Sequence, residues 1–188
     1  MQPRTAHRLS EHRGQQLRRL GAILLMLLAV ATGKPLHAQA TAEELTRFPA
    51  SELTIKSGPD GGASHKFRVW LADTDRRKQQ GLMFVRDLPA DRGMLFVNEQ
   101  PYIASMWMKN TYVSLDMLFI GTDGRVQEIR ARTTPHSLEI IAPRQPALAV
   151  LELRGGEAER RGIVPGDLVI HPTLGRNTNR RQKTTTSR

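Results

Sequence analysis

The sequence contains no cysteine, and this absence excludes several kinds of chemistry. None of its 188 residues carries a thiol, so disulfide bonds, thiolate metal sites and a cysteine nucleophile are ruled out. An exported protein without cysteine needs no oxidative folding, which is compatible with a bacterial periplasm.

Long apolar runs are missing as well. The longest, "LGAILLMLLAV" at residues 20–30, has eleven residues, whereas a membrane-spanning helix needs about 20. It follows a basic stretch and precedes Ala38-Gln39-Ala40, which is the order of a secretory signal peptide. We therefore predict a signal peptide over residues 1–40, cleavage near Ala40, and a periplasmic or secreted protein with no stable transmembrane span after cleavage. An uncleaved N-terminal anchor is the alternative.

Acidic residues are scarce at the two ends of the chain. Residues 1–40 hold six basic residues and one acidic residue, residues 171–188 hold five basic residues and no acidic one, and residues 41–170 hold 17 of each. Because the middle of the chain is neutral, the basic pI is poor evidence for a nucleic-acid surface, and we expect no nucleic-acid partner. The polar segment 173–188 lacks apolar periodicity and is predicted to be a disordered tail.

Short β-rich runs dominate the middle of the chain. After a lead-in segment at residues 41–64, the region 65–172 contains closely spaced apolar runs, and "FIGTDGRVQEI" is a hairpin pattern with its turn at Asp123-Gly124. In this region helices are predicted from a cap at Asp73 or Thr74 to Gly81 and in "GGEAERRG", and "AEELTRF" in the lead-in could start a short helix. This pattern predicts a single mostly β domain (a β-rich α+β fold), an antiparallel barrel-like sandwich with two short helices.

The stretch "SMWMKNTYVSLDM", residues 105–117, mixes large apolar residues with polar ones. If residues 105–109 form a strand, Trp107 and Lys109 share one face. In the following segment Asp116 alternates in phase with apolar residues, and a buried carboxylate needs a partner. One interpretation is a small ligand pocket walled by Trp107, with Lys109, Asn110 and Asp116 as its polar groups. In the other, Asp116 is a buried acceptor and Asn110 only fixes a turn.

Three successive segments resemble the motifs of domain of unknown function 192, a widespread prokaryotic family. They are "GLMFVRDLPADRGMLFV", "SMWMKNTYVSLDMLFIGTDGRV" and "AVLELRGGEAERRGIVPGDLV". The resemblance covers about residues 66–172, and Ser114 stands where the family usually has proline. It implies a compact, mostly β domain that is often exported, and no established activity. The positions carried over as motif residues, none of them as catalytic, are Gly81, Met83, Gly93, Trp107, Lys109, Asn110, Thr111, Asp116, Glu152, Gly166 and Asp167.

The methionines and carboxylates leave further functions open. Five methionines of the middle region (Met83, Met94, Met106, Met108 and Met117) would suit Cu(I), but each lies in an apolar run and is better explained as core, so we predict no metal site and no cofactor. An enzyme, for instance a hydrolase of envelope sugar or lipid, could pair Asp116 with Glu152 or Asp167. We favour a module that binds a small molecule or envelope component, with a hydrolase or a structural accessory protein as alternatives. Neither the ligand nor the oligomeric state follows from the sequence.

Overall fold

The computed structural model describes residues 45–58 and 62–174. The predicted signal peptide lies outside these residues, as does the predicted basic tail from residue 175 onward. The chain divides into two units, residues 1–38 and 39–188, and every described residue belongs to the second. In chain order its elements are β1 (Ala50–Ser57), β2 (Ala63–Ala72), α3 (Asp75–Gln80), β3 (Arg92–Tyr102), β4 (Leu115–Ile120), β5 (Val126–Arg130), β6 (Ala147–Arg154), α4 (Glu157–Arg160) and β7 (Leu168–Ile170).

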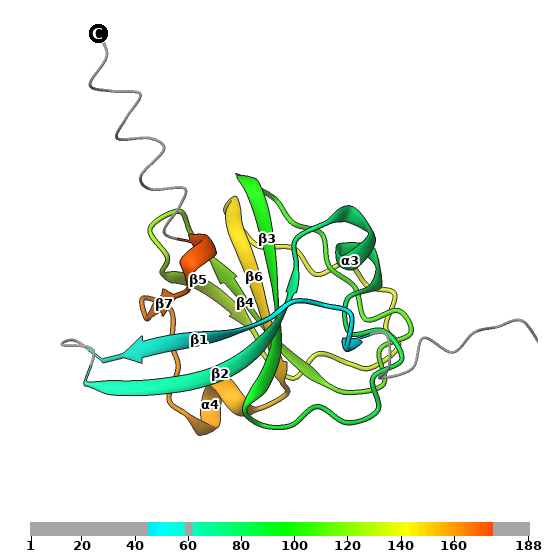
Figure 1. The fold of residues 1–188 in the computed structure, drawn as a ribbon, viewed down its shortest axis with the longest axis horizontal. Coiled ribbons are helices and arrows are strands. Elements are labelled where there is room, and N and C mark those ends of the chain that lie inside the picture. The colour runs from blue at the N-terminus through cyan, green and yellow to red at the C-terminus, as the bar shows by residue number, and fades with distance from the viewer. Residues whose placement is uncertain (1–44, 59–61, 175–188) are drawn as a thin grey trace, which may run out of the picture. The chain divides into compact units, whose positions relative to one another are not determined.

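The domain is mostly β, as predicted, and its seven strands form one sheet in the order β5-β4-β6-β3-β2-β1-β7 (Figure 1). The strand pairs are antiparallel except for one, because β2 and β3 pair in parallel. The connection between them, residues 73–91, contains α3, and a crossover of this length is what a parallel pair requires. Alternation along a strand shows which side chains share a face. It does not show the direction of the neighbouring strand, so the parallel pairing could not be predicted from it.

The sheet curls into a half-barrel whose two edge strands meet at one end. Arg125, just before β5, forms a bridge with Leu168 of β7. Backbone hydrogen bonds from Val126 N–H to the Asp167 carbonyl (2.9 Å) and from Val169 N–H to the Gly124 carbonyl (2.8 Å) complete this clasp. The clasp pairs backbone groups that an open sheet edge would leave exposed.

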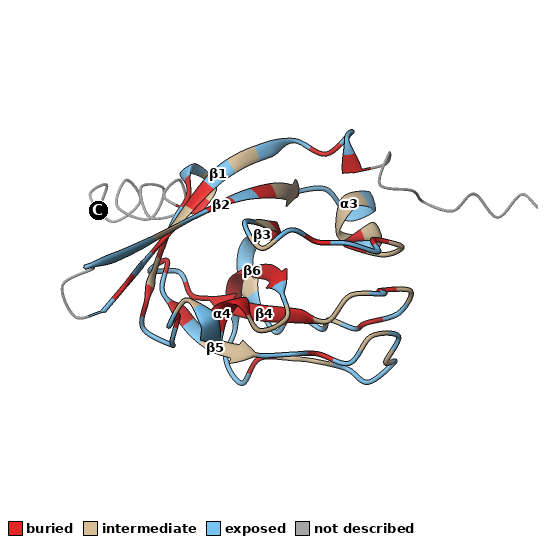
Figure 2. Ribbon diagram, turned by 90° about the horizontal axis from the view of Figure 1, so that it is seen from below, coloured by how far each residue is buried: buried red, intermediate tan, exposed pale blue. Residues whose placement is uncertain are grey.

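Two apolar cores lie on opposite faces of the central strands. All six residues of β4 are buried, and β6 is buried except at Arg154 (Figure 2). Along β4, Leu118 and Ile120 belong to one core, whereas Met117 and Phe119 belong to the other. The apolar runs of these strands match their burial on both faces of the sheet.

Local signals in the sequence located both helices and the β4–β5 hairpin. Thr74 caps α3 by accepting a hydrogen bond from Arg77 N–H (3.4 Å), and the helix ends at Gly81, whose φ is 50°. The segment at residues 105–109 is a loop, so the strand predicted there is wrong.

Only Met106 of this segment forms a bridge, with Ile141, and the chain leaves extended geometry at Asn110, whose φ is 56°. The apolar spacing there reflects Met108 entering the core from a loop.

Candidate functional site

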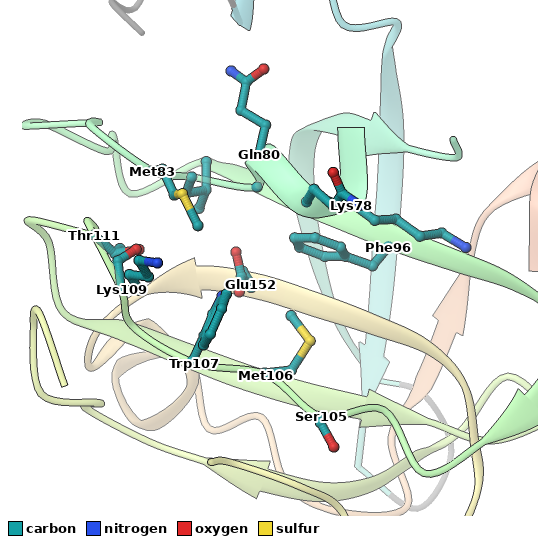
Figure 3. Close-up of a pocket in the computed structure, with 13 residues that line it drawn as sticks. Lys78, Gln80, Met83, Phe96, Ser105, Met106, Trp107, Lys109, Thr111 and Glu152 are labelled. Atoms are coloured by element: carbon teal, nitrogen blue, oxygen red, sulfur yellow. The ribbon is translucent and has the colours of Figure 1, made fainter. Parts of the chain in front are cut away.

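A small pocket opens between the end of α3 and the loop at residues 105–111. Its volume is about 70 Å³, which is well below the roughly 300–1,000 Å³ of pockets that enclose drug-sized ligands. Figure 3 shows its walls and floor. The residues lining it are Lys78, Gln79, Gln80, Gly81, Leu82, Met83, Phe96, Ser105, Met106, Trp107, Lys109, Thr111 and Glu152. The pocket therefore suits one chemical group of a ligand rather than a whole large molecule.

The floor of the pocket carries a buried acid, Glu152 of β6. In the sheet its two neighbours are Met94 of β3 and Met117 of β4, both with no exposed surface. Glu152 itself is 4% exposed, and its Oε2 atom has no hydrogen-bond partner among the described residues. In Figure 3 its carboxyl group lies among Met83, Met106 and Trp107. A buried polar atom without a partner is unusual in a native fold.

The surroundings of Glu152 keep its side chain neutral. Burial disfavours the charged form and raises the pKa of Glu152 from 4.5 to about 8. At neutral pH the group is therefore mostly a carboxylic acid, which can both donate and accept a hydrogen bond. The sequence held a signal for this residue. Glu152 interrupts the apolar run of β6, just as Asp116 interrupts that of β4. A carboxyl group in such a run is expected to be buried and to need a partner. From the sequence, however, Glu152 was named only as a motif position and as a possible second carboxylate beside Asp116.

Trp107 and Lys109 meet at the pocket, as the sequence suggested. The Lys109 ammonium lies 5.2 Å from the centre of the Trp107 ring, a cation–π contact. Trp107 is 46% exposed, so its indole also borders solvent. Asn110 does not line the pocket but stands behind its wall, with Nδ2 4.0 Å from the Met83 sulfur.

Asp116 lies outside the pocket, and its carboxylate is fully engaged by the main chain. It has no exposed surface. Its Oδ1 accepts hydrogen bonds from the N–H groups of Arg132 (2.8 Å) and Gly156 (2.9 Å), and Oδ2 accepts one from Ala158 N–H (2.9 Å). The structure thus brings Trp107 and Lys109 together, leaves Asn110 beside them, and assigns Asp116 the task of joining β4 to the start of α4.

No pair of carboxylates forms from the candidates named in the sequence. Met117 is opposite Glu152 in the sheet and Asp116 is opposite Leu153, so the two acids point to opposite faces. Asp167 accepts hydrogen bonds from the Ser57 hydroxyl (2.7 Å) and Val164 N–H (2.9 Å) near β1. The idea that Asp116 works with Glu152 is therefore wrong, because adjacent positions on a strand face opposite sides.

The methionines divide into two groups. Met94, Met108 and Met117 have no exposed surface and belong to the core, as the sequence favoured. Met83 and Met106 line the pocket, and a ligand there would touch both of them. Within residues 45–58 and 62–174, no three His, Asp or Glu side chains are grouped as a metal ion would require.

The family model for domain of unknown function 192 (Uncharacterized ACR) matches residues 56–171. The chain belongs to this family. Two solved structures are similar to it, each with 39% sequence identity over 65% of this chain. One, from Sinorhizobium meliloti 1021 and described as a proposed transcription regulator, has a TM-score of 0.63 and is covered over 94% of its length. The other, a protein of unknown function from Novosphingobium aromaticivorans DSM 12444, has a TM-score of 0.61 and is covered over 85%.

Family membership establishes the fold of this chain and leaves its activity open. The comparison with curated proteins gives no significant match. No helix of the described residues is long and apolar enough to cross a membrane.

Proposed function

We propose that this member of the family is an exported module that binds a small ligand in the pocket above Glu152. One observation carries the proposal: the Glu152 carboxyl group is buried at the floor of an open pocket, and its Oε2 atom has no hydrogen-bond partner among the described residues. Leaving a buried polar group unpaired costs about 1–3 kcal/mol. An apolar side chain of similar size would avoid that cost, so the carboxyl group is explained by a role in binding a ligand.

The walls of the pocket support the same interpretation. Phe96, Met83 and Met106 offer apolar contact, and the Trp107 indole at the edge can cover a bound group. An apolar concavity with a few converging polar groups is the usual form of a small-molecule site. The ligand would place a hydrogen-bonding group on Glu152 and pack the rest of itself on the indole.

NMR signals of isotope-labelled methionine methyl groups give a direct test of binding. Met83 and Met106 lie in the pocket, whereas Met94, Met108 and Met117 have no exposed surface. We would record methyl spectra of the full chain while adding a panel of small amides, carboxylic acids, sugars and amines. We expect a ligand class to shift the Met83 and Met106 signals in a saturable way. Replacing Glu152→Leu should remove that response, and the matched surface change Glu159→Gln should preserve it. A panel that moves neither signal contradicts the proposal.

Export is tested separately from binding. We expect the mature chain in the envelope fraction to begin at Thr41, because the Ala-x-Ala site precedes it. Mass spectrometry of the recovered protein measures its first residue. A chain retaining residues 1–40 in the membrane fraction would favour the uncleaved anchor instead.

A hydrolase acting on envelope sugar or lipid is the second candidate, and the raised pKa of Glu152 favours it. A carboxyl group with a pKa of about 8 stays protonated at neutral pH and suits a general acid. Chromogenic glycosides and esters would test for turnover. Hydrolysis that Glu152→Gln abolishes without weakening binding would establish the enzyme. The third alternative, a purely structural accessory protein, predicts neither binding nor turnover.

The described role of the Sinorhizobium meliloti relative does not alter this choice. Regulation of transcription normally involves binding to nucleic acid, which requires excess positive charge on the folded part. Here residues 41–170 carry equal numbers of acidic and basic residues. The charge of the domain therefore offers no support for transferring that role.

A further inference from the structure

A second hollow adjoins the pocket along α3. Its volume is about 250 Å³, and it lies between the segment before β1 and the first turns of α3. Gln80, at the end of α3, lines both this hollow and the Glu152 pocket, so the two hollows are neighbours. The lining residues are Arg47, Phe48, Thr74, Arg76, Arg77 and Gln80.

The charge of this hollow, which we name the arginine hollow, is strongly one-sided. Arg77 is held by Asp73 (2.6 Å) and lies over the Phe48 ring (5.8 Å). Arg47 and Arg76 are exposed, and within the described part of the chain neither has a carboxylate partner at ion-pair distance. Among the described residues, none that lines the hollow is acidic. Two guanidinium groups thus face a concave space with their charge uncompensated.

Building on the proposed function, we propose that the arginine hollow binds a phosphoryl group, and that the ligand is a hydroxyl-bearing organic phosphate whose uncharged end reaches Glu152. Guanidinium groups bind phosphate with paired, directional hydrogen bonds. Two of them match the double negative charge of a phosphomonoester. The hydroxyl would bond to Glu152 and occupy the small pocket, whose volume admits only a few atoms.

The neutral floor of the pocket is compatible with such a ligand. A protonated Glu152 does not repel an anion, and Lys109 at the pocket wall adds positive charge. An amine ligand, in contrast, would meet Lys109 and the arginines as like charges. The distribution of charge across both spaces therefore favours an anionic ligand.

Inorganic phosphate is the probe for the arginine hollow. We would follow backbone amide signals of the full chain at low ionic strength while adding phosphate. Saturable shifts confined to residues 47–48 and 74–80 are expected. Affinity should fall at least tenfold in Arg47→Gln and Arg76→Gln and stay unchanged in Arg144→Gln, an exposed arginine elsewhere. Shifts that do not saturate, or that weaken equally in Arg144→Gln, overturn the proposal.

A series of hydroxyalkyl phosphates of increasing length tests whether both spaces serve one ligand. We expect one length to bind at least tenfold more tightly than inorganic phosphate and to lose that advantage in Glu152→Leu. If no length gains affinity, the two-point ligand is rejected. The methyl response of Met83 and Met106 to the broader panel still decides the proposed function independently.

Discussion

Two buried acids on neighbouring strands show how environment sets the role of a side chain. Asp116 and Glu152 are both nearly inaccessible, yet Asp116 accepts three main-chain hydrogen bonds and Glu152 leaves Oε2 without one. The difference follows from the face each residue occupies. Asp116 points to the main chain at the start of α4, whereas Glu152 points to the pocket.

The stability of the protein should depend on pH through Glu152. Because the pKa of Glu152 is about 8 in the folded state and 4.5 when the side chain is exposed to water, the folded protein keeps a proton that the unfolded chain releases. The free energy of unfolding should therefore fall as the pH rises from about 4.5 to about 8, by at most about 1.4 kcal/mol per pH unit. Urea unfolding of Glu152→Gln should show a weaker decline over this interval. Parallel curves for both proteins would contradict the assigned pKa.

Removing the carboxylate of Asp116 should be costly. Asp116→Ala leaves three main-chain N–H groups, one buried and two partly buried, without their acceptor. We expect a loss of about 3 kcal/mol, or roughly 10 °C in the melting temperature. Calorimetry measures the change, and Asp87→Ala, at an exposed position, is the matched control. If Asp116→Ala has the same melting temperature as the wild type, the three N–H groups have found other acceptors.

Helix α4 is short and is stabilised by two carboxylates, one on β4 and one in its own first turn. Asp116 binds its first N–H groups, and Glu157, 2% exposed, accepts hydrogen bonds from Arg154 (2.6 Å), Arg160 (2.9 Å from Nε) and Arg161 (3.3 Å). Burial alone would raise the pKa of Glu157, but these three arginines outweigh it and hold the pKa at about 2. A helix of four residues has too few internal hydrogen bonds to persist without such support.

Acid should loosen the α4 region through Glu157. Its pKa is lowered from 4.5 to about 2, so its contribution to stability is complete above about pH 4.5 and is lost as the pH falls toward 2. Glu157→Gln should be less stable than the wild type at neutral pH, with the difference shrinking in acid. Unfolding curves of both proteins measured from pH 7 down to about pH 2 test this. A difference in the free energy of unfolding that stays constant over this range would refute it.

Strand β3 passes so close to β6 that Gly93 has no room for a side chain. A Cβ atom there would lie 2.5 Å from the Glu152 carbonyl oxygen and 2.9 Å from Leu153 Cδ2. Gly93→Ala must shift one strand, and we expect a loss of about 1–3 kcal/mol together with a displaced Glu152 floor.

Gly62→Ala is the control for Gly93→Ala, since nothing lies within 4 Å of a Cβ built there. Thermal unfolding compares the two variants, and the methyl signals of Met83 and Met106 report the state of the pocket. Equal stability of both variants would show that the β3–β6 pair tolerates the shift.

Elements with strong local signals were predictable, and elements set by distant contacts were not. Thr74 and Gly81 fix the limits of α3, and Gly124 with φ of 78° fixes the β4–β5 turn. The parallel β2–β3 pair and the loop at residues 105–109 depend on segments far away in the chain. Of the candidate site, Trp107 and Lys109 do lie together, but in a loop and not on the strand face from which their proximity was predicted. The separation of Asp116 from the pocket required the register of β4 and β6.

At the level of the whole domain, one central strand supports both cores and the floor of the pocket. Strand β6 pairs with β3 and β4, and through Glu152 it reaches the pocket walls, which are formed by two segments that precede it in the sequence, residues 78–83 and 105–111. The half-barrel therefore holds the pocket between a rigid sheet and two connecting segments. Variation in those segments could change the ligand while the sheet stays the same.

The clasp between the residues around Gly124 and those around Leu168 makes two strand ends depend on each other. If it opens, the ends of β5 and β7 lose each other as partners in a single event, and both expose unpaired main-chain donors and acceptors to other molecules. Hydrogen exchange at Val126 and Val169 would therefore report the first step toward self-association. An insertion that lengthens the chain beside Gly124 or Leu168 is expected to make the protein aggregate faster on storage before it lowers the melting temperature.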